Sequence, residues 1–158
     1  MKYLPFVIAI AALACLTFAP LGDAISSTEF SPDKEEVRQI REVIEKAYID
    51  GIHCKQNIDL AETGFHPGFS MLVLRNGKLI KINLEKWFEM MGGSRDSMED
   101  KGGPAVTSTF RFVDIAGPAA VAKLDVYKGG KLFATDYLSL YRFSDGWKIV
   151  SKVFTFAD

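Results

Sequence analysis

Hydrophobic residues recur through the early part of the chain at the spacing of an amphipathic helix. Ser31, Pro32 and Asp33 predict the helix start, as N-cap, first helical residue and first-turn acid. Gly51 is expected to interrupt or bend this helix. Between Asp33 and Gly51, most residues are charged, and the recurring apolar positions are Val37, Ile40, Ile44, Ala47 and Tyr48. The pattern therefore predicts one long helix that buries a single face.

A hairpin and two short helices are expected next. Residues 57–63 are expected to form a short helix. Apolar residues 69–74 and alternating residues 78–82 flank Asn76 and Gly77, which are preferred in a tight hairpin turn. Asn83 then predicts the start of a helix that ends at Gly92 and Gly93, before a polar loop at 94–104. The expected buried face of that helix holds Leu84, Trp87, Phe88 and Met91.

The rest of the chain alternates as four long strands with tight connections. They are expected at residues 107–115, 119–127, 132–143 and 147–156. Because helices come first and an antiparallel meander comes last, the sequence predicts an α+β domain.

The two faces of these late strands differ in composition. One face is expected to carry Ala120, Ala122, Leu124, Val126, Leu138, Leu140, Ile149 and Val153. The other is expected to carry Lys123, Asp125, Tyr127, Tyr137, Ser139, Tyr141, Lys152 and Phe154. An apolar face opposite a face of aromatic and charged residues indicates either a core and a pocket, or a subunit interface and a pocket. Strand alternation leaves both assignments open.

An export signal is expected before this domain. Lys2 precedes an apolar run over residues 4–19, and the small residues Gly22 and Ala24 predict cleavage after Ala24. The chain then divides into a signal peptide at 1–24 and a single domain at 25–158, secreted or periplasmic. The run is short for a bilayer span. Lipidation at Cys15 is the less favoured route, because Ala12 stands where a lipobox usually has Leu.

Composition and charge narrow the function further. The chain has 19 Lys and Arg and 20 Asp and Glu, so it lacks the positive field that collects nucleic acid or anionic lipid. Only Cys54 remains after cleavage, and it is expected to be a small buried residue. The scattered His and Cys residues predict no metal site, and no motif for a phosphate loop or a serine nucleophile is present. No cofactor, nucleic acid or membrane partner is therefore expected.

Several motifs together resemble a known family. They are Tyr48 and Gly51 near the helix end, the turn Phe65-His66-Pro67, the Asn-Gly hairpin, the Trp-bearing short helix, and the segments DYLSLYRF (136–143) and GWKIVSKVF (146–154). In this order they resemble the putative lumazine-binding branch of the nuclear transport factor 2-like superfamily. The resemblance implies a cone-shaped, curved antiparallel sheet around a long N-terminal helix and shorter helices, with a cavity at the open end. It also implies dimerisation through the sheet and pteridine or flavin-like ligands.

The superfamily also contains ketosteroid isomerase and SnoaL-like polyketide cyclases. The resemblance places Tyr48 where the isomerases have the tyrosine that donates to an oxyanion. The general base would fall near Val73, and the assisting acid near Ser139, where this sequence has no acid. His66 or Asp125 could act in their place. Each also has a structural interpretation, His66 as a turn residue and Asp125 as half of a cross-strand ion pair with Lys123 or Lys152.

The sequence thus leads to a dimeric, exported protein that binds a small hydrophobic or aromatic molecule without obligatory catalysis. The expected ligand-binding residues are Tyr48, His66, Trp87, Tyr137, Ser139, Tyr141, Lys152 and Phe154. One alternative is an isomerase, dehydratase or cyclase acting through His66 or Asp125 with Tyr48. The other is a structural dimerisation module whose cavity is filled by its own side chains.

Overall fold

A long helix and a six-stranded sheet make up most of the described chain. The computed structural model describes residues 33–92 and 103–158, within a unit that runs from Ser31 to Asp158. The predicted signal peptide, Cys15, the helix-start residues Ser31 and Pro32, and most of the predicted loop at 94–104 lie outside the described residues. No helix of the described ranges is long and apolar enough to cross a membrane.

The elements follow the predicted order. The helices are α1 (Lys34–Val43), the π-helical segment η1 (Ile44–Cys54), α2 (Ile58–Glu62) and α3 (Leu84–Met90). The strands are β1 (Phe65–Arg75), β2 (Lys78–Ile82), β3 (Val106–Ala116), β4 (Ala119–Lys128), β5 (Lys131–Phe143) and β6 (Gly146–Phe156). The predicted α+β class, the curved sheet around a long helix and the four late strands are confirmed.

The long helix differs from the prediction at its start and near its end. Asp33 is itself the N-cap, because its Oδ1 accepts a hydrogen bond of 3.0 Å from the amide of Glu35. Gly51 was predicted to interrupt or bend the helix; η1 continues through it to Cys54, so the helix is not interrupted there. A Cβ at position 51 would lie 2.9 Å from the backbone nitrogen of Ala61, so this glycine lets α2 pack closely.

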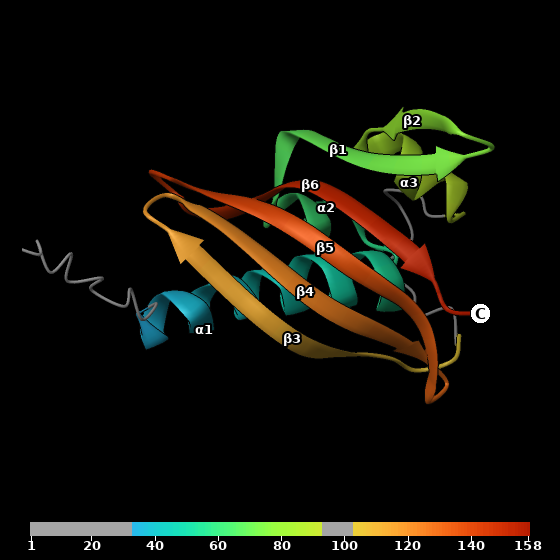
Figure 1. Ribbon diagram of the computed structural model, residues 1–158, viewed down its shortest axis with the longest axis horizontal. Helices are drawn as coiled ribbons and strands as arrows, with labels where there is room; N and C mark the ends of the chain where they lie inside the picture. Colours follow the sequence, from blue (N-terminus) through green and yellow to red (C-terminus); the bar gives the residue numbers. More distant parts are fainter. Residues whose placement is uncertain (1–32, 93–102) are drawn as a thin grey trace, which may run out of the picture. The chain divides into compact units, whose positions relative to one another are not determined.

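The sheet is open and curved, with strand order β2-β1-β6-β5-β4-β3. All neighbours pair antiparallel except β1 and β6, which are parallel. In Figure 1 the strands cross in front of α1 and the helical segment that follows it. The predicted hairpin is confirmed, with Asn76 and Gly77 both at positive φ as its turn requires.

A β-bulge in β6 changes which residues face the helix. Leu140 pairs with Ile149 and Ser139 pairs with Ser151, so Val150 is an extra residue. After it Lys152 is buried, whereas Val153 is exposed. The prediction that Lys152 and Phe154 share a face with Tyr137 and Tyr141, and Val153 with the core residues, is therefore wrong, because a one-residue insertion moves every later side chain to the opposite face.

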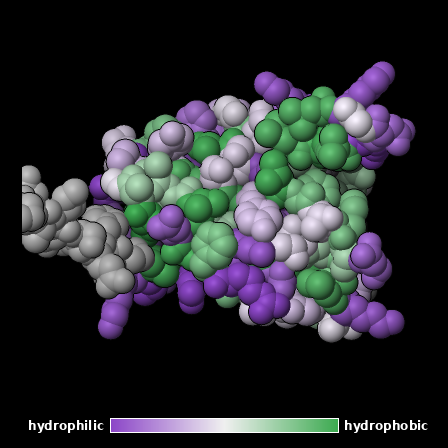
Figure 2. Space-filling model, in the orientation of Figure 1, coloured by the Kyte–Doolittle hydropathy of each residue, from purple (hydrophilic) through white to green (hydrophobic). Residues whose placement is uncertain are grey.

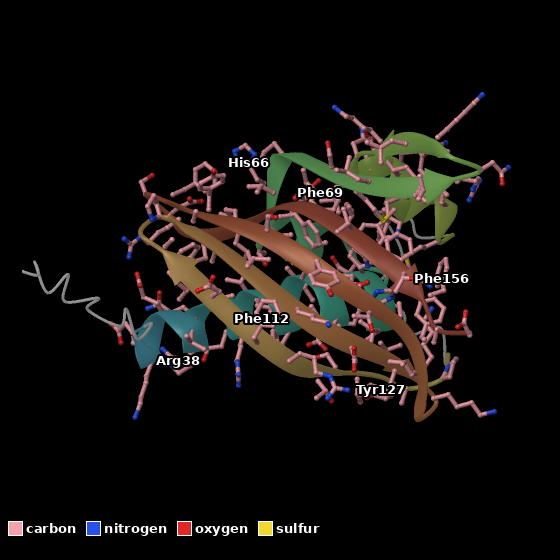
Figure 3. The ribbon with its side chains drawn as sticks, viewed as in Figure 1. Arg38, His66, Phe69, Phe112, Tyr127 and Phe156 are labelled. Carbon is pink, nitrogen blue, oxygen red and sulfur yellow. The ribbon has the colours of Figure 1, made fainter. Side chains whose placement is uncertain are left out.

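The outer face of the sheet is partly apolar. Figure 2 views the molecule from the side on which the strands lie in front, and apolar residues gather there in patches beside polar ones. Figure 3 labels Phe112 on β3 in the same view. The partly exposed large side chains of the outer face include Phe112, Tyr137, Tyr141 and Val153.

Candidate functional site

Three buried polar side chains meet between the long helix and the sheet. Tyr48 of η1 donates a hydrogen bond to Asp136 of β5, and Lys152 of β6 donates to the hydroxyl oxygen of Tyr48. The Nζ of Lys152 also lies 2.9 Å from Oδ2 of Asp136. Asp136 is fully buried and Lys152 is 4% exposed. A buried pair of this kind tolerates the loss of hydration only because each charge has its partner.

Burial sets the proton affinities in this network. It lowers the pKa of Lys152, an effect that the neighbouring charge of Asp136 partly opposes. It raises the pKa of Tyr48 well above its usual value, and the charge of Asp136 raises it further. The phenol of Tyr48 is therefore neutral at physiological pH, and its O–H group is already used in the hydrogen bond to Asp136.

His53 lies beside this network, and its side chain makes no hydrogen bond with the described part of the chain. Its ring is 4.8 Å from the ring of Tyr48 and 6.2 Å from that of Trp87, between centroids. Both ring nitrogens are buried and have no hydrogen-bond partner among the described residues. Burial, followed by the charges of Lys152 and Lys128, lowers the pKa of His53 to about 3, so its imidazole is neutral.

A cavity of about 250 Å³ opens beside Lys152 and His53. Its walls come from η1, β1, β2 and α3, together with the C-terminal end of β4, the N-terminal part of β5 and the C-terminal half of β6. The lining residues are His53, Met71, Val73, Arg75, Ile82, Trp87, Met90, Met91, Lys128, Phe133, Ala134, Lys152, Phe154 and Phe156. This volume is slightly below the range usual for drug-sized ligands, so it suits a molecule of one or two rings.

Aromatic rings surround the ammonium at the cavity wall. The Nζ of Lys152 lies 5.0 Å from the ring centroid of Trp87 and 4.8 Å from that of Phe154. It also lies 4.5 Å from the ring centroid of Tyr48. These distances are within the range of cation–π attraction, which partly replaces the lost hydration of the charge.

Comparison with known proteins identifies the family. The family model described as Putative lumazine-binding matches residues 35–155. The chain belongs to this family. A search of curated protein sequences gives no match.

The solved structures that resemble the chain share its fold. An NTF2-like protein of unknown function from Shewanella baltica is 21% identical, with a TM-score of 0.65 over 81% of this chain and 98% of that one. Another from Silicibacter pomeroyi is 18% identical, with a TM-score of 0.63 over 80% and 100%. A domain with a cystatin-like fold from Nostoc punctiforme is 13% identical, with a TM-score of 0.56 over 80% of each chain. The predicted nuclear transport factor 2-like fold is confirmed, whereas similarity at this level leaves the ligand open.

Within this putative lumazine-binding fold, four of the expected ligand-binding residues lie together. Trp87, Lys152 and Phe154 line the cavity. Tyr48 lies next to them: its hydroxyl oxygen accepts a hydrogen bond from Lys152, and its ring centroid is 5.7 Å from that of Trp87. Lys152 and Phe154 reach the cavity only because of the bulge at Val150.

The expected residues Tyr137, Ser139 and Tyr141 lie on the outer face of the sheet, away from the cavity. Tyr141 is 50% exposed, and Ser139 pairs across the strands with Ser151. The structure therefore does not bring these three together with Lys152.

Asp125, a candidate for catalysis, also lies on the outer face. Its Oδ2 accepts a hydrogen bond of 2.7 Å from Nε of Arg111, and its Oδ1 accepts one of 2.7 Å from Thr135. Hydrogen bonds from Thr135 and Arg111 lower its pKa. The structural interpretation of Asp125 as a cross-strand ion pair holds, with Arg111 as the partner in place of Lys123 or Lys152.

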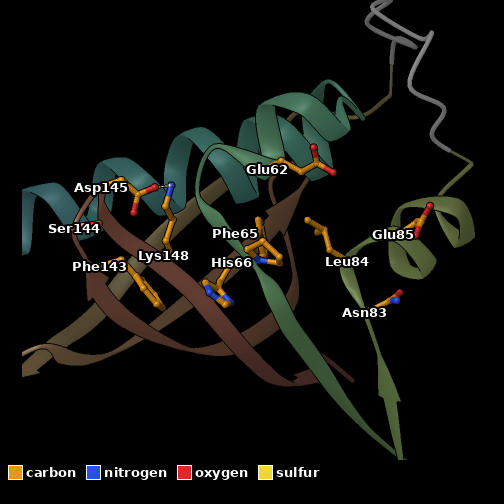
Figure 4. A pocket seen from close by; sticks show the side chains of 11 residues that line it. Glu62, Phe65, His66, Asn83, Leu84, Glu85, Phe143, Ser144, Asp145 and Lys148 are labelled. Carbon is orange, nitrogen blue, oxygen red and sulfur yellow. Dashed lines mark ion pairs between the residues drawn. The ribbon is translucent and has the colours of Figure 1, made fainter.

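His66 lies in a separate surface groove of about 700 Å³ (Figure 4). Its ring stacks on Phe143 at 4.6 Å, and its Nδ1 accepts a hydrogen bond of 3.0 Å from the amide of Gly68. The salt bridge between Asp145 and Lys148 lies in the same groove. Figure 3 shows His66 and Phe156, a cavity residue, far apart along the molecule, so His66 does not belong to the same site as Lys152.

Sequence reasoning missed two members of the site. Asp136 was named only as the first residue of the segment DYLSLYRF, and the resemblance placed the acid that assists Tyr48 near Ser139, three residues later. His53 gave no signal, because one histidine near a helix end has no motif around it. Its position five residues after Tyr48 on the same helix is the feature that could have pointed to it.

The site has no features of a metal centre. Within residues 33–92 and 103–158 no three His, Cys, Asp or Glu side chains gather closely enough to hold an ion. Cys54 is partly buried, with its Sγ 3.8 Å from the carbonyl oxygen of Val106. The cavity can interact with a ligand through hydrogen bonds, positive charge and aromatic contacts.

Proposed function

We propose that the protein is an exported binding protein whose interior cavity holds one small hydrophobic or aromatic molecule without transforming it. The observation that carries this is the cavity beside Lys152: an aromatic and aliphatic pocket with one buried cation and an imidazole whose nitrogens have no partner among residues 33–92 and 103–158. Apolar pockets with a few convergent polar groups are the usual form of a ligand site.

The contents of the cavity favour binding over catalysis. Proton abstraction next to a carbonyl needs a base whose pKa lies near the working pH. Among the described residues of the wall, His53 is the only neutral base, and its pKa of about 3 makes it a weak one. Val73, near which the isomerase comparison places the base, is an apolar lining residue.

An isomerase or cyclase remains the second candidate, favoured by the Tyr48–Asp136 hydrogen bond. Such a pair can stabilise an oxyanion if its proton faces the substrate. Here the hydroxyl group of Tyr48 donates its hydrogen bond to Asp136, and Tyr48 is not among the residues of the cavity wall. A catalytic role would therefore require the network to rearrange when substrate binds.

A thermal-shift screen of the mature protein tests the binding proposal. Lumazine, suggested by the family description, and small aromatic acids and amides are suitable probes. A ligand of the cavity is expected to raise the melting temperature with concentration. Val73→Trp, which fills the cavity, should abolish the shift, whereas Leu79→Trp, on the exposed edge strand β2 outside the cavity, should retain it. Equal shifts in both variants would place binding elsewhere.

The export part of the proposal has its own test. Intact mass measurement of the protein from its own host is expected to give a chain that begins at Ile25. A lipid-modified chain that begins at Cys15 would replace the cleavage proposal with membrane anchoring, and an unprocessed Met1 would contradict export.

A further inference from the structure

We infer that the cavity selects an anion, an aromatic acid whose negatively charged group lies between Lys128 and Lys152 and contacts His53. This inference rests on the proposed binding function and specifies the class of its ligand. Four observations support it: the sign of the charges on the wall, the unused donor of Lys152, the unpartnered nitrogens of His53, and the aromatic walls.

The charges on the wall have one sign. Among the described residues that line the cavity, Arg75, Lys128 and Lys152 are cationic and none is a carboxylate. Asp136 lies behind Lys152 and compensates that one charge. No ion pair joins Arg75 or Lys128 to a carboxylate of the described ranges. Among the described residues, the positive charge of the wall is therefore not fully compensated, and an anion would neutralise it.

Lys128 acts on the same space as Lys152. Its Nζ lies 3.8 Å from the ring centroid of Phe133, another wall residue. Its positive charge lowers the pKa values of both His53 and Lys152. These cations repel one another across the cavity, and an anion between them would turn that repulsion into two attractions.

Lys152 has a donor left for a ligand. An ammonium carries three N–H groups, and those of Lys152 reach Asp136 and Tyr48 with two hydrogen bonds. Since the residue lines the cavity, a ligand oxygen can accept the third. Hydrogen bonds from a charged donor to an anionic oxygen are the stronger kind.

His53 offers a further hydrogen-bond donor to the anionic group. Neutral imidazole has one N–H donor and one nitrogen acceptor, and both nitrogens here are buried without a partner. Leaving such groups unpaired is unfavourable, so a ligand that pairs with one of them gains affinity. A carboxylate oxygen of the ligand can accept from the N–H. Because the two ring nitrogens point in different directions, one small rigid ligand pairs with only one of them.

Three ligands of equal size and different charge test the inference. 4-Hydroxybenzoate, 4-hydroxybenzamide and 4-hydroxybenzylamine are titrated calorimetrically into the mature protein at low salt. The acid is expected to bind at least ten-fold more tightly than the amide, and the amine most weakly. Lys128→Met should reduce the preference of acid over amide at least three-fold. Lys131→Met, on an exposed residue outside the cavity, should leave it unchanged.

The outcomes separate the inference from the proposed function. If the amide binds as tightly as the acid and Val73→Trp abolishes both, the cavity binds ligands but the anion inference is wrong. If none of the three binds, both the binding function and the inference are contradicted. An unchanged preference in Lys128→Met would also overturn the inference.

A second variant tests the contact with His53. His53→Phe keeps an aromatic ring and removes both nitrogens, so the fold is expected to persist. It should weaken 4-hydroxybenzoate several-fold more than 4-hydroxybenzamide, because only the acid offers a charged oxygen to the N–H of His53. Equal weakening of the acid and the amide would show that His53 does not contact the anionic group.

Discussion

Each buried charge of the central network depends on its partner. Lys152→Met would leave the carboxylate of Asp136 uncompensated at a site with no exposure. We expect the free energy of unfolding to fall by about 3–5 kcal/mol, measured by urea denaturation. The double variant Asp136→Asn with Lys152→Met removes both charges and should recover a large part of this loss. Strictly additive losses would contradict the coupling between the two residues.

His53 should make stability depend on pH. Its folded pKa of about 3 lies below its ordinary value of 6.5, so the unfolded state binds the proton more readily between these values. Its contribution is complete above pH 6.5 and is lost as the pH falls toward 3. Between pH 7 and pH 5 the loss is about 2 kcal/mol at 1.4 kcal/mol per unit. The groups that face it are Tyr48, Trp87, Lys128 and Lys152.

Denaturation curves of His53→Phe and of a control test this dependence. His53→Phe should flatten the change in unfolding free energy between pH 7 and pH 5. His66→Gln, which alters the histidine of the surface groove, should keep the slope. A slope that persists in His53→Phe would show that other groups cause it.

At the scale of the elements, the close contact of η1 with α2 depends on Gly51. A Cβ there would lie 2.9 Å from the backbone nitrogen of Ala61, which cannot move as a side chain can. Although alanine favours helices by about 1 kcal/mol over glycine, we expect Gly51→Ala to lower the unfolding free energy by about 1–3 kcal/mol. Gly103→Ala, in open space, is the control. Stabilisation by Gly51→Ala would contradict the packing described.

The elements could be predicted from the sequence because their signals are local. Alternation, turn residues and caps depend on neighbours in the chain, so the four late strands, the hairpin and the Asn83 cap were found. The bulge at Val150 has no such signal, since it arises from the register between β5 and β6. This is why Lys152 and Phe154 were chosen as ligand residues but placed on the wrong face. Asp136 and His53 were missed because their role depends on contacts across the fold.

At the scale of the whole molecule, the outer face of the sheet is available for a second copy of the chain. Family resemblance predicts a homodimer through the sheet, and the partly exposed Tyr137, Tyr141 and Val153 lie on that face. Sedimentation of the mature protein is expected to show a dimer, and Tyr141→Lys with Val153→Lys should produce a monomer. Leu79→Lys, on the edge strand β2, should leave the dimer intact. A monomeric wild type would contradict this expectation.

Native mass spectrometry of the mature protein from its own host, followed by release and identification of whatever is bound, tests the central claim most directly. We predict one small aromatic anion per chain in the wild type, and none in Val73→Trp prepared in parallel. A wild-type protein that carries no small molecule, or a molecule retained equally by Val73→Trp, would contradict a binding role for the cavity beside Lys152.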